Sequence, residues 1–135
     1  MDAAVPYVLT LGRLLMALIF VREGFHTLST RTTIATSLKN RGVPFAGILV
    51  WASVVIEILG GLMFIGGFLT RWVALVLFFY TMILALMFHA YWAVPAATRR
   101  TESLFFFIHL AMMGGMLYVA AFGAGPCSID GLLGR

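Results

Sequence analysis

Two long stretches without charged residues constrain the fold more than any other feature of the chain. Residues 72–98 and 103–129 contain no Asp, Glu, Lys or Arg. A helix that crosses a bilayer needs about 20 mostly apolar residues, and each stretch exceeds that length. Only helices and closed barrels can satisfy every backbone hydrogen bond within lipid. Because the stretches lack the alternation of barrel strands, they predict membrane-spanning helices.

The composition supports a membrane environment for the whole chain. Apolar residues make up 62% of it, charged residues 10%, and the mean hydropathy is +1.05. Soluble proteins carry about 25% charged residues, so we expect membrane lipid to be the main contact of the surface. The net charge of +4 comes without a basic stripe that contains interleaved aromatic residues. A membrane protein of this kind is not expected to bind nucleic acid.

The pattern of apolar and polar segments predicts an all-α, polytopic membrane protein with four transmembrane helices in one bundle. The expected helices lie near residues 6–28, 45–68, 72–92 and 104–122 of a single domain, 1–135. Polar connections at 29–44 and 93–103 are expected on one side of the membrane. Both termini and a tight turn near Gly66 are expected on the other side.

The distribution of Lys and Arg predicts the orientation. The side with the two polar connections carries Arg31, Lys39, Arg41, Arg99 and Arg100, whereas the opposite side carries Arg71 and Arg135. Loops rich in Lys and Arg remain in the cytoplasm. We therefore expect both termini on the non-cytoplasmic side.

Two ionisable residues lie inside the expected helices. Glu57 is the only charged residue between Arg41 and Arg71, and Arg13 interrupts the first apolar stretch. A charge within the bilayer is costly unless it faces protein or water and has a partner. By helix rise, both residues lie roughly 18–23 Å from the side with the polar connections. We therefore predict a buried ion pair between Arg13 and Glu57, which either fixes the helix register or borders a ligand site.

Three histidines and a glutamate form a second group of polar residues. Glu23 and His26 lie near the end of the first expected helix, His89 near the end of the third, and His109 near the start of the fourth. Helix rise places the three histidines at one depth, roughly 5–10 Å inside the same membrane face. Because they share this depth, we expect a polar layer there.

Three interpretations of this layer remain open. The histidines could be separate interfacial residues, each satisfied by a neighbour or water. They could instead form a pocket with Glu23 for a lipid headgroup or a quinone ring, in which neutral histidine donates to a carbonyl oxygen. The third interpretation is a metal or haem site at His26, His89 and His109, which imidazole ligands suit. No local ligand spacing such as H-x-x-x-H supports this third interpretation.

Several motifs resemble those of the DoxX family of small bacterial membrane proteins. They are Leu11-Gly12-Arg13-Leu14-Leu15, Glu57-Ile58-Leu59-Gly60-Gly61 with Gly67 and Thr70-Arg71, His89, Leu110-Ala111-Met112-Met113-Gly114-Gly115, and Gly125 with Ser128-Ile129-Asp130. The similarity covers nearly the whole chain. The chain departs from the family pattern where members often have a Lys near position 27 and Lys-Asn near 108–109. Thr27, Ile108 and His109 stand there instead.

The resemblance implies a four-helix protein of the bacterial inner membrane, with both termini in the periplasm by the charge count above. It also implies an accessory or anchor subunit of a redox system, with a quinone as the cofactor and other membrane or redox subunits, or a second copy, as partners. The catalytic residues are unknown, because no self-contained catalytic motif occurs. Two alternatives remain, a non-catalytic structural subunit or assembly factor and an oligomeric transporter or channel.

Overall fold

The computed structural model describes residues 4–134, and all regular secondary structure within that range is helical. The elements are α1 (Val5–Asn40), α2 (Ala46–Gly66), α3 (Thr70–Phe88), the 3-10 helix η1 (Tyr91–Ala93), α4 (Ala96–Phe122) and the short α5 (Ile129–Leu132). Four helical spans are long and apolar enough to cross a membrane, and they correspond to α1, α2, α3 with η1, and α4. The prediction of an all-α protein with four transmembrane helices is confirmed.

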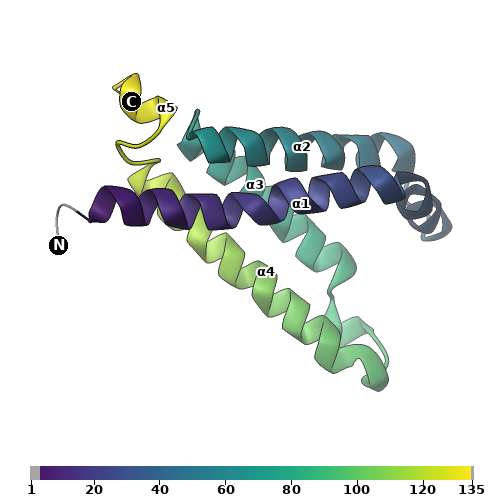
Figure 1. Ribbon diagram of the computed structural model, residues 1–135. Coiled ribbons are helices and arrows are strands. Elements are labelled where there is room, and N and C mark those ends of the chain that lie inside the picture. Colours follow the sequence, from purple (N-terminus) through teal and green to yellow (C-terminus); the bar gives the residue numbers. More distant parts are fainter. Residues whose placement is uncertain (1–3, 135) are drawn as a thin grey trace.

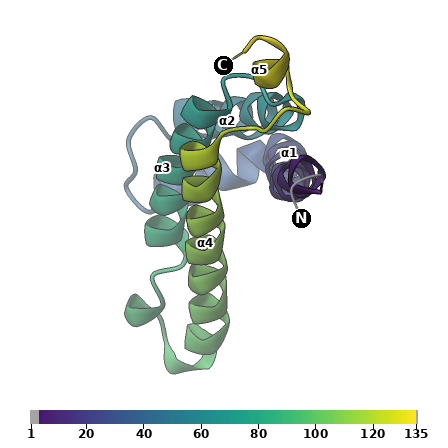
Figure 2. The same cartoon turned by 90° about the vertical axis from the view of Figure 1, so that its left-hand side faces the viewer.

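The four long helices form two antiparallel hairpins. α1 lies against α2, and α3 lies against α4, as Figure 1 shows. The hairpins meet at what we call the terminal end, which holds the α2–α3 turn, α5 and the start of α1. At the opposite, loop end, the α1–α2 and α3–α4 connections lie far apart, because α1 and α4 diverge (Figures 1 and 2).

Large side chains from all four helices form the core near the terminal end. Phe64, Leu77 and Met116 are fully buried, and Phe20 of α1 packs against the same cluster. Glycines bring the backbones together there: a Cβ on Gly61 would lie 3.1 Å from the Val21 backbone nitrogen. Close approach at small residues is typical of packed membrane helices.

The first helix is longer than the sequence pattern suggested. The expectation that it ends near residue 28 is wrong, because α1 continues through the polar segment to Asn40. That segment contains no Gly or Pro, so nothing in it stops a helix. Leu38 also stabilises the extension, because it is buried against Ala46 and Val50 of α2. The α1–α2 connection therefore contains only the residues between Asn40 and Ala46.

The fourth helix also starts earlier than expected. α4 begins at Ala96, directly after Pro95, and not near residue 104. Proline is tolerated at the start of a helix, because the amide hydrogen it lacks would have no helical acceptor there. The charged residues Arg99, Arg100 and Glu102 therefore lie on the first turns of α4 instead of in a loop.

Candidate functional site

Arg13 is buried at the terminal end, where it binds backbone carbonyl groups. Its side chain is on α1 and the residue is only 3% exposed. The guanidinium donates hydrogen bonds to the carbonyl oxygens of Ala124 at 2.7 Å, Cys127 at 3.0 Å and Ile65 at 3.4 Å. Arg13 thus joins the start of α1 to the end of α2 and to the segment between α4 and α5.

Asp130 completes this junction from the other end of the chain. Its carboxylate accepts hydrogen bonds from the backbone amides of Leu69 at 2.9 Å and Thr70 at 2.7 Å. Thr70 is the first residue of α3, so Asp130 caps that helix, whose own preceding residue provides no side-chain cap. Asp130 is also close enough to Arg13 for electrostatic attraction.

We call this junction the C-terminal clasp and define it by Arg13, Gly67, Thr70, Ser128 and Asp130. Gly67 has a left-handed backbone with φ of 66°, and a Cβ there would lie 2.4 Å from the Ser128 Cβ. The Ser128 hydroxyl accepts a hydrogen bond from the Gly131 amide and so caps α5. These contacts bring together residues from three distant motifs of the sequence and join the helices at the terminal end.

Glu57 lies at a second buried polar position, between α1, α2 and α3. It is 4% exposed, and its Oε1 accepts a hydrogen bond of 2.5 Å from the Tyr80 hydroxyl of α3. Its Oε2 is buried and has no hydrogen-bond partner within residues 4–134. Three residues of α1, Glu23, His26 and Thr27, are close enough to interact with the carboxyl group. We call Glu57, Tyr80 and these three residues the Glu57 site.

The predicted ion pair between Arg13 and Glu57 is wrong, although both residues are buried as expected. Each has other partners, and no salt bridge joins them in the described part of the chain. Gly24 of α1 faces Glu57, since a Cβ on Gly24 would lie 3.0 Å from the Glu57 Cβ. Arg13 lies 11 positions earlier on α1, which corresponds to roughly 16 Å of helix. The extension of α1 to Asn40 shifts the register by which α1 meets α2, and this shift separates the pair.

Two of the histidines lie together at the loop end of the α3–α4 hairpin. The ring centroids of His89 and His109 are 4.9 Å apart. The Nδ1 atom of His89 lies 2.8 Å from Oε2 of Glu102 on α4. The Nδ1 atom of His109 lies 2.8 Å from the carbonyl oxygen of Phe105, one turn earlier on the same helix. We call His89 and His109 the histidine pair.

The predicted polar layer of Glu23, His26, His89 and His109 therefore divides into two sites. Glu23 and His26 belong to the Glu57 site, and Glu23 also forms an ion pair with its neighbour Arg22. His89 and His109 lie on the other hairpin. The third interpretation of the layer, a shared metal or haem site at His26, His89 and His109, finds no support for the same reason, because α1 and α4 diverge at the loop end (Figure 1). Across residues 4–134, no three His, Cys, Asp or Glu side chains converge to hold a metal ion.

The sequence analysis did not identify two residues that are central to these sites, Tyr80 and Glu102. Tyr80 lies in the middle of a transmembrane helix, whereas membrane tyrosines are enriched at the interfaces. The position of Tyr80 in the middle of a span was therefore the feature of the sequence that could have identified it as a site residue. Glu102 was assigned to a loop, so its position on α4 facing His89 could not be inferred from the pattern of residues.

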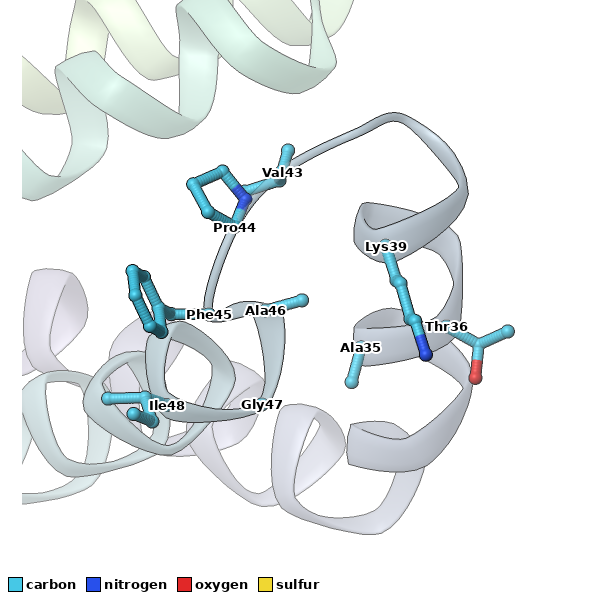
Figure 3. Close-up of a pocket in the computed structure, with 9 residues that line it drawn as sticks. All are labelled: Ala35, Thr36, Lys39, Val43, Pro44, Phe45, Ala46, Gly47 and Ile48. Carbon is cyan, nitrogen blue, oxygen red and sulfur yellow. The ribbon is translucent and has the colours of Figure 1, made fainter.

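A shallow hollow lies at the loop end, between the end of α1 and the start of α2 (Figure 3). Its lining is mostly apolar, and the polar side chains in it are Lys39 and Thr36. It is open to the surroundings and contains none of the predicted site residues. We therefore assign no ligand to this hollow.

Comparisons with known proteins agree with the motifs and the helical fold. The family model described as DoxX matches residues 8–90. The chain belongs to the DoxX family. It is 32% identical to the inner membrane protein YqjF of Escherichia coli K12 over 124 residues, which cover 92% of this chain and 90% of YqjF. It is 27% identical to the inner membrane protein YphA of the same organism over 128 residues, which cover 95% and 91% of the two chains. No solved structure gave a significant match.

Proposed function

We propose that this inner-membrane protein is an accessory or anchor subunit of a quinone-linked redox system and binds a quinone headgroup at the Glu57 site. The observation that carries the proposal is the buried Oε2 atom of Glu57, which has no hydrogen bond within residues 4–134 although the Thr27 side chain lies near the carboxyl group, in a residue that is 4% exposed. Buried polar groups are nearly always hydrogen-bonded, so an unsatisfied carboxyl oxygen inside a membrane protein calls for a partner. A quinone is dissolved in the bilayer, so it does not have to cross water to approach the membrane-spanning helices.

The chemistry of the site suits a quinone and its reduced form. A protonated Glu57 carboxyl group can donate a hydrogen bond from Oε2 to a quinone carbonyl oxygen, while the Tyr80 hydroxyl donates to its Oε1 atom. A quinol hydroxyl can in turn donate to the carboxylate. Reduction of a quinone to a quinol takes up two electrons and two protons. Glu23, which is half-buried, and His26, which is exposed, lie near Glu57 and can carry those protons to the surface.

The electrons require a second protein in this proposal. The sequence contains no dinucleotide fingerprint, CxxC motif or other recognisable electron-carrier motif. A redox subunit that delivers electrons to the bound quinone is therefore the expected partner. In this proposal the chain binds the quinone and the partner delivers the electrons, so the chain is an accessory or anchor subunit and not an enzyme that acts alone.

Quinone retention tests the proposal. The wild-type protein, purified in a mild detergent, is expected to contain quinone in its organic extract and to bind added decylubiquinone. Tyr80→Phe and Glu57→Gln each remove or weaken one hydrogen bond next to the headgroup. Hydrogen bonds to charged groups contribute about 1.5–3 kcal/mol, so we expect binding to weaken roughly tenfold to hundredfold. Binding is measured by titration of the purified proteins with decylubiquinone.

Glu102→Gln provides the matched control, because it alters a carboxyl group of the other hairpin, and it should bind decylubiquinone like the wild type. All variants are compared by circular dichroism and gel filtration to establish that they are folded. A wild-type protein that neither contains quinone nor binds decylubiquinone contradicts the proposal. Equal binding by folded Tyr80→Phe, folded Glu57→Gln and wild type contradicts the assignment of the site.

A second candidate is a structural subunit or assembly factor without a quinone site. The observation that favours it is the surface of α4, on which Met116 is the one buried residue within the helix. Such a helix offers an apolar face to helices of another subunit as well as to lipid. A stable partner subunit that co-purifies with a quinone-free protein would favour this candidate over the first.

We also propose that both termini lie in the periplasm, on the basis of the Lys and Arg count. Cys127 is the single cysteine of the chain and is exposed at the terminal end, so it reports which side that end faces. A membrane-impermeant maleimide should label Cys127 in intact spheroplasts as fully as in lysed ones. Cys127→Ser measures background labelling. Labelling only after lysis would place the terminal end in the cytoplasm and contradict the proposed orientation.

A further inference from the structure

We propose that the histidine pair is a binding site for a divalent transition-metal ion such as Zn²⁺ or Cu²⁺. His89 follows the last residue of α3, and His109 lies on α4. The two side chains thus come from the two arms of one hairpin. Neither residue belongs to the Glu57 site, so this inference is independent of the proposed quinone function.

The hydrogen bonds of the two rings leave the same nitrogen free on each. A backbone carbonyl oxygen can only accept, so the His109 Nδ1 atom beside the Phe105 carbonyl must carry the proton. The His89 Nδ1 atom likewise donates to the Glu102 carboxylate, whose oxygens accept hydrogen bonds. In a neutral imidazole the other nitrogen, Nε2, then carries a lone pair. No hydrogen bond to either Nε2 atom occurs within the described residues.

This arrangement is the one that histidine ligands of metal ions adopt. A ligating histidine almost always donates its second ring N–H to a carboxylate or a backbone carbonyl, which fixes the tautomer and orients the ring. Here Glu102 and the Phe105 carbonyl are those two acceptors, one for each ring.

The separation of the two rings also fits a shared metal ion. With a metal–nitrogen distance of about 2.0–2.1 Å, the ring centroid lies roughly 3.2 Å from the metal. Ligand angles of about 90–110° then place the two centroids roughly 4.5–5.2 Å apart. The observed distance of 4.9 Å between the centroids of His89 and His109 falls within that interval.

The remaining coordination positions are open to other ligands. No third metal-ligating side chain converges on the pair within residues 4–134, so water, a lipid phosphate oxygen or a partner's side chain completes the coordination. The His89 and Glu102 side chains are 23% and 26% exposed, which leaves a path for an ion to enter. Imidazole ligands favour Zn²⁺, Cu²⁺ and Ni²⁺ over Mg²⁺ or Ca²⁺. We therefore expect the histidine pair to bind the first three ions more tightly than the last two.

Metal titration of the intact protein in detergent, without a polyhistidine tag, tests this inference. We expect one Zn²⁺ per chain by equilibrium dialysis and no comparable binding of Mg²⁺. With Cu²⁺ in place of Zn²⁺, the electron paramagnetic resonance spectrum should show hyperfine coupling to two imidazole nitrogens. His89→Gln and His109→Gln should each reduce the coupling to one nitrogen. Glu102→Leu should weaken Zn²⁺ affinity about 10- to 100-fold while both nitrogens remain coupled.

His26→Gln is the matched control, since it removes the one histidine outside the pair, and it should leave both measurements unchanged. The proposal fails if the double variant His89→Gln/His109→Gln binds Zn²⁺ like the wild type. It also fails if the wild-type Cu²⁺ spectrum shows coupling to fewer than two nitrogens. Neither result bears on quinone binding, which depends on residues of α1, α2 and the middle of α3.

Discussion

Replacement of Arg13 with leucine is expected to destabilise the protein by about 3–5 kcal/mol, the range measured when one partner of a buried charged interaction is removed. The change leaves the carbonyl groups of Ala124, Cys127 and Ile65 without the donor that now binds them. It also leaves Asp130 without the positive charge of the clasp. The free energy of unfolding in mixed detergent micelles, titrated with sodium dodecyl sulfate, measures the effect.

Two further variants separate the role of Arg13 from that of an arginine elsewhere on α1. Arg22→Leu changes a side chain that is 78% exposed and should alter the free energy of unfolding by less than about 1 kcal/mol. Arg13→Lys keeps the charge, but a single ammonium group does not reproduce the geometry of a guanidinium. Its free energy of unfolding should therefore lie between those of Arg13→Leu and Arg22→Leu. If Arg13→Leu and Arg22→Leu unfold alike, the C-terminal clasp does not stabilise the fold.

Replacement of Gly67 with alanine is expected to have a comparable effect for a steric reason. The left-handed backbone at φ of 66° costs an L-residue about 1–2 kcal/mol, and overpacking adds about 1–3 kcal/mol. The new Cβ would lie 2.4 Å from the Ser128 Cβ and 2.5 Å from the Arg13 Nη1 atom. We therefore expect a loss of about 2–5 kcal/mol in the same detergent titration.

Gly12→Ala is the matched control for Gly67→Ala. Gly12 lies within α1, and a Cβ placed on it would meet no atom within 4 Å. Alanine is a better helix former than glycine, so this variant should gain about 0.5–1 kcal/mol. A Gly67→Ala protein as stable as Gly12→Ala would contradict the close packing of Gly67 against the clasp.

The transmembrane helices could be predicted because their signal is local. Each residue contributes separately to the free energy of transfer into lipid, so a long apolar stretch identifies a span without knowledge of its neighbours. The same reasoning predicted that Arg13 and Glu57 would be shielded from lipid, and both are buried. Polarity misled the prediction at residues 29–40, where the chain is polar but contains nothing that breaks a helix.

The pairing of the polar side chains could not be predicted, because it depends on helix ends and on the angle between hairpins. The expected end of α1, near residue 28, was 12 residues short of its actual end at Asn40, and this error led to the prediction that Arg13 lies opposite Glu57. In the folded protein, Arg13 contacts the C-terminal segment and Glu57 contacts Tyr80. Depth along a helix also does not determine which side chains meet. His26 and His109 have similar expected depths, yet they lie on helices that diverge (Figure 2).

The amino-acid sequence alone determined that this is an all-α membrane protein of the DoxX family with four spans, and that its few intramembrane charges face protein. The tertiary structure decided which of those charges meet: Arg13 with the backbone near Asp130, Glu57 with Tyr80, and His89 with Glu102 and His109. The physical reason is that the free energy of insertion into lipid is a sum of contributions from single residues. A contact between two helices depends instead on how the helices are aligned along their axes, which is their register. That register is set by glycine contacts and short turns such as those at Gly24, Gly61 and Gly67, whose effect appears only when the helices are packed.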